Sequence, residues 1–275
     1  MLRQAWANCT RCELGQRRIN VQGNFVFGHG AVRGIMFVGE GPGKEEEIEG
    51  LPFVGKSGSL LRKVLMQLGL APEDYYLTNT VCCRSCSPQA DGAGQPIFRK
   101  NYKTKLMELA FKDEPPTPPQ YLACLPRLHE EIYLVDPIVI VGLGAKACEA
   151  LRGKSITITR DRGDAEHISI PGASSRPSVT KDHKWTRKQK GEVVSPMTPN
   201  EVRYHFIPTL HPAYVIRKLA DEDEKSPFRH FVADIKKAIR TYETYMELVF
   251  GEVPSRRVDL DENEMHQQIQ ATDED

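Results

Sequence analysis

Residues that could do chemistry follow three separate apolar segments of this chain. The segment GEGPGKEEEIEGLPFVGKSG (39–58) follows the apolar run 34–38, Asn79 follows a second run, and His211 follows a third. Glycines let backbone N–H groups approach an anion or a carbonyl, and amide and imidazole groups bind or polarise a ligand. If the runs are neighbouring parallel strands, all three groups reach one crevice. Taken singly, each has a plainer explanation as a turn, a helix cap or a structural histidine.

The glycine-rich segment does not match the common nucleotide-binding patterns. GEGPGKEE lacks the third glycine of G-x-G-x-x-G and has no GK[ST] ending. A glutamate at position 40 that points into the crevice would also disfavour a phosphate. The sequence therefore indicates a ligand other than a nucleotide phosphate.

Seven cysteines form two closely spaced groups and two isolated positions. Two ligand sets remain open on the spacing, since a zinc site and an iron–sulfur cluster each need four thiolates. The zinc set is Cys9, Cys12, Cys83 and Cys86, which spacing alone favours slightly; the cluster set is Cys9, Cys12, Cys83 and Cys124. A third interpretation treats them as small buried hydrophobic residues, and it is the favoured one for Cys148.

The elements that must position these residues alternate along the chain. Strands are expected at 34–39, 76–81, 137–142 and 205–210, and helices at 57–68, about 121–134, 145–151 and 228–250. Alternating strands and helices indicate a parallel sheet with helices on both faces.

Two long segments interrupt this alternation, and the chain ends on an acidic tail. Residues 86–120 are rich in Pro and Gly and predict a loop around one short helix, and residues 153–203 have little periodicity. From Val258 to Asp275 there are seven acidic residues and no Lys or Arg, which predicts a solvated, disordered end. We expect one domain at 1–250 and a tail at 251–275 that could recruit a protein partner.

Composition and charge place the chain among ordinary globular proteins. Its 275 residues are 40% hydrophobic and 27% charged, with a formal net charge of zero. The N-terminal segment lacks the hydrophobic stretch of a signal peptide, and no apolar run approaches the ~20 residues that span a bilayer. We therefore expect a cytoplasmic monomer that does not bind membranes. Neutrality does not exclude DNA, because residues 181–190 hold five Lys/Arg against one Asp.

Taken together, these segments resemble the iron–sulfur uracil-DNA glycosylases, often called family 4. The resemblance rests on the segment 39–58, on LTNTVCCR, on HPAYVIR, on the N-terminal C-x2-C and on the cysteine before LPRL, in order across residues 6–250. It implies a three-layer α/β/α sandwich around a four-stranded parallel sheet, with long loop insertions. It also implies hydrolysis of the base–sugar bond of uracil in DNA, and a [4Fe–4S] cluster on Cys9, Cys12, Cys83 and Cys124.

The resemblance implies a role for each candidate site residue. The target base is flipped out of the stack into a pocket. Phe53 would stack on it, Asn79 would bond its Watson–Crick edge, and Gly39 and Gly41 would line the pocket. His211 would stabilise the leaving anion, as donors aimed at developing charge do. Glu40 would orient the attacking water, with Glu46 as a second candidate. DNA phosphates would be gripped by Pro212 and Arg217 of HPAYVIR.

The chain departs from the family pattern in two places. Between Cys83 and Cys124 lie 40 residues, more than the family spacing, and the segment before HPAY is also longer. Lys184, Trp185 and Arg187 in that segment suit contact with a phosphate backbone and a base, or form a solvated loop. Two alternative functions follow: a glycosylase for a bulky modified pyrimidine, such as a hypermodified phage base, and a catalytically silent iron–sulfur DNA-binding module.

Overall fold

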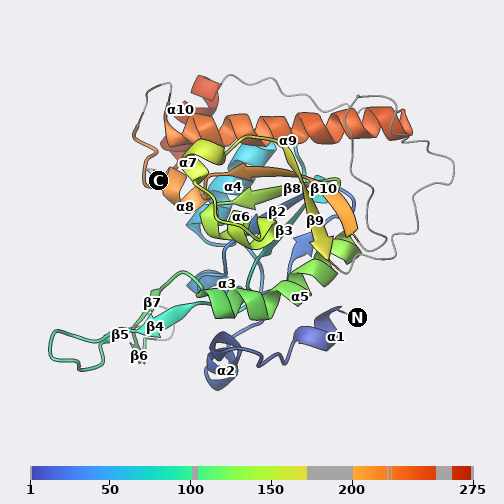
Figure 1. Cartoon of the computed structure of the whole chain (residues 1–275). Coiled ribbons are helices and arrows are strands. Elements are labelled where there is room, and N and C mark those ends of the chain that lie inside the picture. Colours follow the sequence, from blue (N-terminus) through green and yellow to red (C-terminus); the bar gives the residue numbers. More distant parts are fainter. Residues whose placement is uncertain are drawn as a thin grey trace.

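A six-stranded sheet forms the centre of the computed structural model, which describes residues 2–100, 105–171, 201–221, 223, 225–251 and 262–273 (Figure 1). The strand order is β1-β3-β2-β8-β10-β9. The strands are β1 (His29–Gly30), β2 (Ile35–Gly39), β3 (Tyr75–Asn79), β8 (Val139–Leu143), β9 (Glu166–Pro171) and β10 (Glu201–Thr209). The four inner strands are parallel, and β1 and β9 are antiparallel edges.

Helices cover both faces of the sheet, which explains why its strands are apolar without alternation. Every residue of β2 and of β8 is buried. One face packs Ile35, Phe37 and Val141 against the first helical layer; the other packs Met36 and Ile140 against the second. The first layer is α4 (Lys56–Gln67), α8 (Pro212–Ile216), α9 (Pro227–Phe250) and α10 (Glu262–Asp273); the second is α5 (Pro118–Val135) and α6 (Ala145–Arg152).

Short elements complete the described part of the chain. They are α1 (Leu2–Trp6), α2 (Glu13–Asn20), α3 (Lys44–Glu49), the 3-10 turn Pro72–Asp74 and α7 (Ile158–Asp161). In Figure 1, α1 and α2 lie on the α5 side of the sheet, and α9 runs across the opposite face. This arrangement places the N-terminal cysteine loop, which lies between α1 and α2, beside α5.

The predicted α/β/α sandwich is confirmed, including its four parallel strands and four main helices. The two antiparallel edge strands were not predicted. β1 has only two residues, both exposed, so it has no apolar pattern to detect. β9 lies within the second predicted insertion, whose residues 172–200 fall outside the described residues.

The prediction of a helix within the first insertion is wrong, because its described residues up to Thr117 form two antiparallel ribbons. These pair β4 (Cys86–Pro88) with β7 (Phe111–Asp113), and β5 (Phe98–Lys100) with β6 (Met107–Leu109). Short strands in a Pro- and Gly-rich sequence are held by cross-strand backbone bonds, which local composition does not reveal.

The prediction of a disordered tail is wrong for residues 262–273, which form α10. Met265 and Ile269 of this helix are buried in the core beside α4 and α9. The Gln270 side chain also donates to the Leu219 carbonyl at 2.9 Å. The acidic composition hid two apolar residues one helical turn apart, and that spacing is enough to dock a helix. The predicted domain boundary at residue 250 stays a prediction.

Candidate active site at the carboxyl edge of the sheet

The register of the parallel strands brings their carboxyl ends into one row. Gly39 of β2 lies opposite Asn79 of β3, and Leu143 of β8 lies opposite Thr209 of β10. After β2 the chain forms β3 on one side of it, and the next parallel strand, β8, pairs with β2 on its other side. The direction in which strands are added therefore reverses at β2. Ligands bind at such reversal points in α/β sheets, outside the carboxyl ends of the strands.

Gly39, Phe53 and Asn79 meet at the end of β2. A Cβ atom placed on Gly39 would lie 2.4 Å from Asn79 Oδ1 and 2.6 Å from Phe53 Cζ. Glycine is therefore required for the amide and the ring to approach the strand this closely. Asn79 and Phe53 are only 3% and 5% exposed, so the surrounding protein fixes both side chains. Three of the four predicted base-binding residues thus lie together.

Phe53 has a backbone conformation that is rare for a bulky residue. Its φ is 58°, in the left-handed region. The Arg62 side chain donates to the Phe53 carbonyl, and a Cβ on Gly58 would lie 1.6 Å from that oxygen. Packing against the start of α4 therefore holds the strained residue. Strain of this kind is common at functional sites, where the surrounding structure over-determines the backbone.

Glu40 is partly buried beside these residues, and its backbone is tied to the segment after β3. The Glu40 carbonyl accepts from the Thr80 hydroxyl at 2.5 Å and from the Val81 N–H at 3.3 Å. Burial raises the pKa of the Glu40 carboxyl, and the positive charge of Lys146 partly offsets this. Lys146 belongs to α6, which follows β8, so the charge pair spans the reversal point.

Glu46, the second candidate acid, has a different environment. One carboxylate oxygen accepts from the Gly43 N–H at 2.9 Å and the other from the Gly55 N–H at 2.8 Å. The side chain is 8% exposed. It therefore joins the two ends of the glycine-rich loop. These contacts favour a structural task for Glu46 over the predicted catalytic one.

His211 lies after β10, at the N-cap of α8. Its Nδ1 accepts from the Ala213 N–H at 3.1 Å, which leaves the proton of the neutral ring on Nε2. Burial, with a smaller contribution from the Arg217 charge, lowers the pKa of His211 to about 4. The imidazole is therefore neutral at pH 7. Gly144 packs against it, since a Cβ there would lie 2.9 Å from His211 Cβ.

Arg127 is a further site residue that sequence reasoning did not single out. This α5 side chain is fully buried and forms an ion pair with Glu131 one turn later. Its Nη2 donates to the carbonyls of Asn79 and Thr80 at 2.7 and 2.8 Å. Glu131 in turn accepts from the Thr78 hydroxyl at 2.7 Å. The pair therefore fixes the carboxyl end of β3, from which Asn79 projects. Its sequence signal was an Arg and a Glu four residues apart on the apolar face of a helix.

Arg127 also connects this strand end to the cysteines. The same Nη2 lies 3.7 Å from Cys124 Sγ. A thiol hydrogen bond from Cys82, together with the Arg127 charge, lowers the pKa of Cys124 to about 5. The Cys82 thiol and the Arg127 cation therefore favour the thiolate form of Cys124, which is the form that binds a metal.

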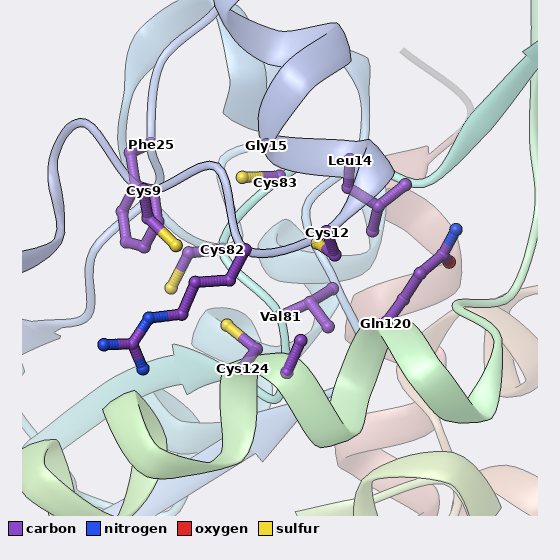
Figure 2. Close-up of a pocket in the computed structure, with 12 residues that line it drawn as sticks. Cys9, Cys12, Leu14, Gly15, Phe25, Val81, Cys82, Cys83, Gln120 and Cys124 are labelled. Atoms are coloured by element: carbon purple, nitrogen blue, oxygen red, sulfur yellow. The ribbon is translucent and has the colours of Figure 1, made fainter.

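Five cysteines line one hollow between the N-terminal loop, the segment after β3 and α5 (Figure 2). They are Cys9, Cys12, Cys82, Cys83 and Cys124. The loop that carries Cys9 is held by Arg18, which donates to the Ala7 carbonyl at 2.9 Å, and by Gly15, which packs on the Cys9 carbonyl. All four cysteines of the predicted cluster set therefore line the same hollow, although 40 residues separate Cys83 from Cys124.

Cys86 does not line this hollow, which argues against the zinc set. It lies in β4, near the charges of Arg84, Arg17 and Glu47. Among the residues that the structure describes, no three His, Cys, Asp or Glu side chains gather tightly enough for a single metal ion. Burial raises the pKa of Cys83 to about 12, and the binding of a metal to such a thiol releases its proton. Four thiols that line one hollow are the type of donor that an iron–sulfur cluster needs.

The predicted DNA-binding residues have separate outcomes. Pro212 is buried at the first position of α8, so only its loop backbone can face a ligand, while Arg217 is exposed at the end of that helix. Gly41, the fourth predicted base-binding residue, lies beside the loop after β3, where a Cβ would lie 2.9 Å from Val81. Lys184, Trp185 and Arg187 lie outside the described residues.

Within the described parts of the chain, no helix is both long and apolar enough to cross a membrane.

Comparison with known proteins identifies relatives across most of the chain. A family profile described as the uracil DNA glycosylase superfamily matches residues 27–236. A type-4 uracil-DNA glycosylase of Thermotoga maritima is 32% identical over 232 residues, covering 84% of this chain and 87% of the relative. One of Sulfurisphaera tokodaii is 29% identical over 229 residues, covering 79% and 78%, and one of Archaeoglobus fulgidus is 26% identical over 215 residues, covering 72% and 94%. The resemblance seen in the motifs is confirmed, and the chain belongs to the uracil DNA glycosylase superfamily.

Proposed function

We propose that this chain flips uracil out of DNA and hydrolyses its N-glycosidic bond, leaving an abasic site. One observation carries the proposal: Gly39, Phe53 and Asn79 lie in contact, and a neutral His211 follows another strand at the same edge of the sheet. The type-4 uracil-DNA glycosylases to which the chain is similar support the same activity.

Recognition of the base requires a flat apolar surface and a matched polar edge. Phe53 provides a ring held by packing, on which a pyrimidine stacks. The Asn79 amide both donates and accepts, so it can donate to uracil O4 and accept from N3–H. A cytosine presents the opposite pattern at these two atoms, and this difference gives the selectivity. Arg127 would act as a positioning residue, because it holds the Asn79 carbonyl.

Bond cleavage leaves negative charge on the base near O2 and positive charge on the sugar. His211 would donate its Nε2–H to O2, and a neutral donor is already in place because the pKa of the ring is about 4. The backbone N–H groups near Gly41 would add to this stabilisation. Glu40 would orient water toward the sugar, and the negative charge of its carboxylate would favour the cationic transition state. Glu46 would hold the loop that carries Glu40.

The surrounding residues would grip the DNA and stiffen the protein. Arg217 and the N–H groups of the HPAY loop would bind phosphates flanking the flipped nucleotide. Lys184, Trp185 and Arg187 stay predicted DNA contacts. A [4Fe–4S] cluster on Cys9, Cys12, Cys83 and Cys124 would cross-link the N-terminal loop, the segment after β3 and α5. Its contribution would be structural, since hydrolysis needs no electron transfer. A cytoplasmic location stays a prediction.

Uracil release from synthetic DNA tests the proposal. Purified protein is incubated with oligonucleotides that contain uracil, cytosine or a bulky modified pyrimidine, and abasic sites are cleaved with alkali. We expect uracil-dependent cleavage that falls by about 10²–10³-fold in His211→Ala, the usual cost of losing one donor to a developing anion. Asn79→Asp should lose activity similarly, because a carboxylate cannot donate to O4. His29→Ala, at an exposed edge position, is the matched control and should retain full activity.

Two results would overturn the proposal. Cleavage of only the modified oligonucleotide would assign the pocket to a bulky pyrimidine. No cleavage of any substrate, together with tight DNA binding that His211→Ala leaves unchanged, would assign the chain to the silent DNA-binding class.

A further inference from the structure

The first insertion forms an arm that begins at the candidate site. We define the hairpin arm as residues 86–100 and 105–117, which hold β4 to β7. Its inner ribbon (β4 with β7) and its outer ribbon (β5 with β6) are continuous. The Gln89 N–H donates to the Ala110 carbonyl and the Ala110 N–H donates to the Ile97 carbonyl, both at 2.8 Å. In Figure 1 the arm projects away from the sheet, on the side where α3 lies.

The root of the hairpin arm is bound to the glycine-rich loop. Arg84 donates to the Asp113 carboxylate at 2.6 Å and lies 3.8 Å from Glu47 of α3. Pro116, in the segment between β7 and α5, would touch a Cβ on Gly41 at 3.7 Å. The direction of the arm is therefore fixed relative to the candidate site, and it leaves from the edge of the sheet at which DNA must bind.

The outer ribbon exposes both large apolar and basic side chains. Phe98, Leu106 and Met107 are 54%, 66% and 62% exposed. Arg99, Lys100 and Lys105 are also exposed, while Glu108 is the one acidic residue among the described residues of this ribbon. In the ribbon register Phe98 faces Leu109 and Lys100 faces Met107, so these four side chains share one face of the ribbon, whereas Arg99 faces Glu108 on the other face. Folding does not need these side chains on the surface, and such a patch is typical of a binding site.

We propose that the outer ribbon of the hairpin arm binds duplex DNA beside the nucleotide held in the candidate site. This inference rests on the proposed function. A two-stranded ribbon fits the major groove, where apolar side chains can contact thymine methyl groups. Lys100 lies on the apolar face and Arg99 on the opposite face, so a ribbon inserted in the groove presents basic side chains to the phosphates on both sides, and their binding releases counterions. The arm thereby lengthens the DNA footprint beyond the base pocket.

The charge of the ribbon favours DNA over a second copy of the chain. Two such ribbons packed together would bring six cations against two glutamates, and like charges at short range repel. The phosphate backbone is complementary to the same surface. Self-association through Phe98 and Met107 is therefore kept as an outcome of the test.

The test measures binding of the full chain to a uracil-free duplex across a range of salt concentrations, by fluorescence anisotropy. The arm variant is Arg99→Gln/Lys100→Gln/Lys105→Gln. The control variant Arg33→Gln/Lys154→Gln/Arg240→Gln removes the same charge from exposed positions outside the hairpin arm. We expect the arm variant to bind about tenfold more weakly, and its slope of log K against log salt to fall by about 2 to 3. The control variant should keep the wild-type slope.

A second variant, Phe98→Ser/Met107→Ser, tests the apolar contact, with light scattering as a second readout. We expect weaker duplex binding and an unchanged molar mass. Equal salt slopes for the arm and control variants would overturn the proposal, as would a change of molar mass with unchanged DNA binding. Failure of the proposed function is separate, because it would appear as no uracil release by the wild type from a short single-stranded oligonucleotide.

Discussion

Two arginine–carboxylate pairs, one fully and one partly buried, support opposite ends of the candidate site, and they differ in their other contacts. On the α5 face, Glu131 binds the Thr78 hydroxyl of β3 at 2.7 Å and pairs with Arg127. On the α9 face, Asp234 binds the Thr209 hydroxyl of β10, also at 2.7 Å, and pairs with Arg162.

The remaining contacts of the two arginines distinguish the pairs. Arg127 is fully buried and donates to two carbonyls at the end of β3, beside Cys124. The Arg162 side chain is 17% exposed, and its other partners, the His230 carbonyl and ring, belong to α9. The first pair therefore joins the site to the cysteine hollow, whereas the second joins it only to a helix. The Arg127–Glu131 pair thus positions the end of β3, whereas the Arg162–Asp234 pair mainly stabilises the fold.

Arg127→Met should have the largest effect. It leaves Glu131 buried without its cation, which typically costs about 3–5 kcal/mol of unfolding free energy. It also frees the Asn79 and Thr80 carbonyls, so kcat/KM for uracil release should fall. Urea unfolding and steady-state kinetics measure the two effects.

A double variant separates positioning from stability in this pair. Arg127→Met/Glu131→Leu removes both charges, so it should recover part of the stability but not the activity. Full recovery of kcat/KM in the double variant would show that Arg127 does not position Asn79.

Gly39→Ala should follow, as a direct change at the strand end that Arg127 holds. The new methyl group would overlap the Asn79 amide and the Phe53 ring, and overpacking of this kind costs about 1–3 kcal/mol. A displacement near 1 Å of these groups would lower kcat/KM about 10²-fold. Gly92→Ala, which meets open space, is the control. Similar kinetics for both variants would contradict the proposed base pocket.

Arg162→Met should cost less than Arg127→Met. It leaves the Asp234 carboxylate with its Thr209 bond but without a cation, and a buried group with a lost partner costs about 1–3 kcal/mol. Because Arg162 holds no carbonyl of the candidate site, kcat/KM should change little. A loss of activity equal to that of Arg127→Met would remove the distinction between the two pairs.

Asp234→Asn should give the smallest effect, seen in the pH dependence of stability. Burial raises the pKa of Asp234 above its ordinary value despite its pairing with Arg162. The folded state therefore binds the proton more tightly than the unfolded state. Stability from this group is greatest below the unfolded pKa and falls as pH rises through the folded pKa. The unfolding free energy of Asp234→Asn should lack this fall. Parallel pH curves for the two proteins would contradict the shift.

Much of the fold and part of the candidate site could be predicted because the signals are local. The continuous apolar run at 35–38 identifies a strand covered on both faces, and the residues that follow such strands must share an edge. Gly39, Asn79 and His211 were found in this way. The edge strands, the inner ribbon of the hairpin arm and α10 were missed, since each depends on a partner distant in the sequence.

The sequence by itself determined the parallel α/β sheet, the glycine-rich loop and the family, because periodicity and motif spacing carry that information. Tertiary structure decided which of two residues of the same type belongs to the site. It placed Glu40 beside Lys146 but bound Glu46 to two loop N–H groups, and it gathered Cys124 rather than Cys86 with the other thiols. It also gave Arg127 its task. The physical reason is that burial and hydrogen-bond partners, which set the charge and position of these groups, come from segments far apart in the chain.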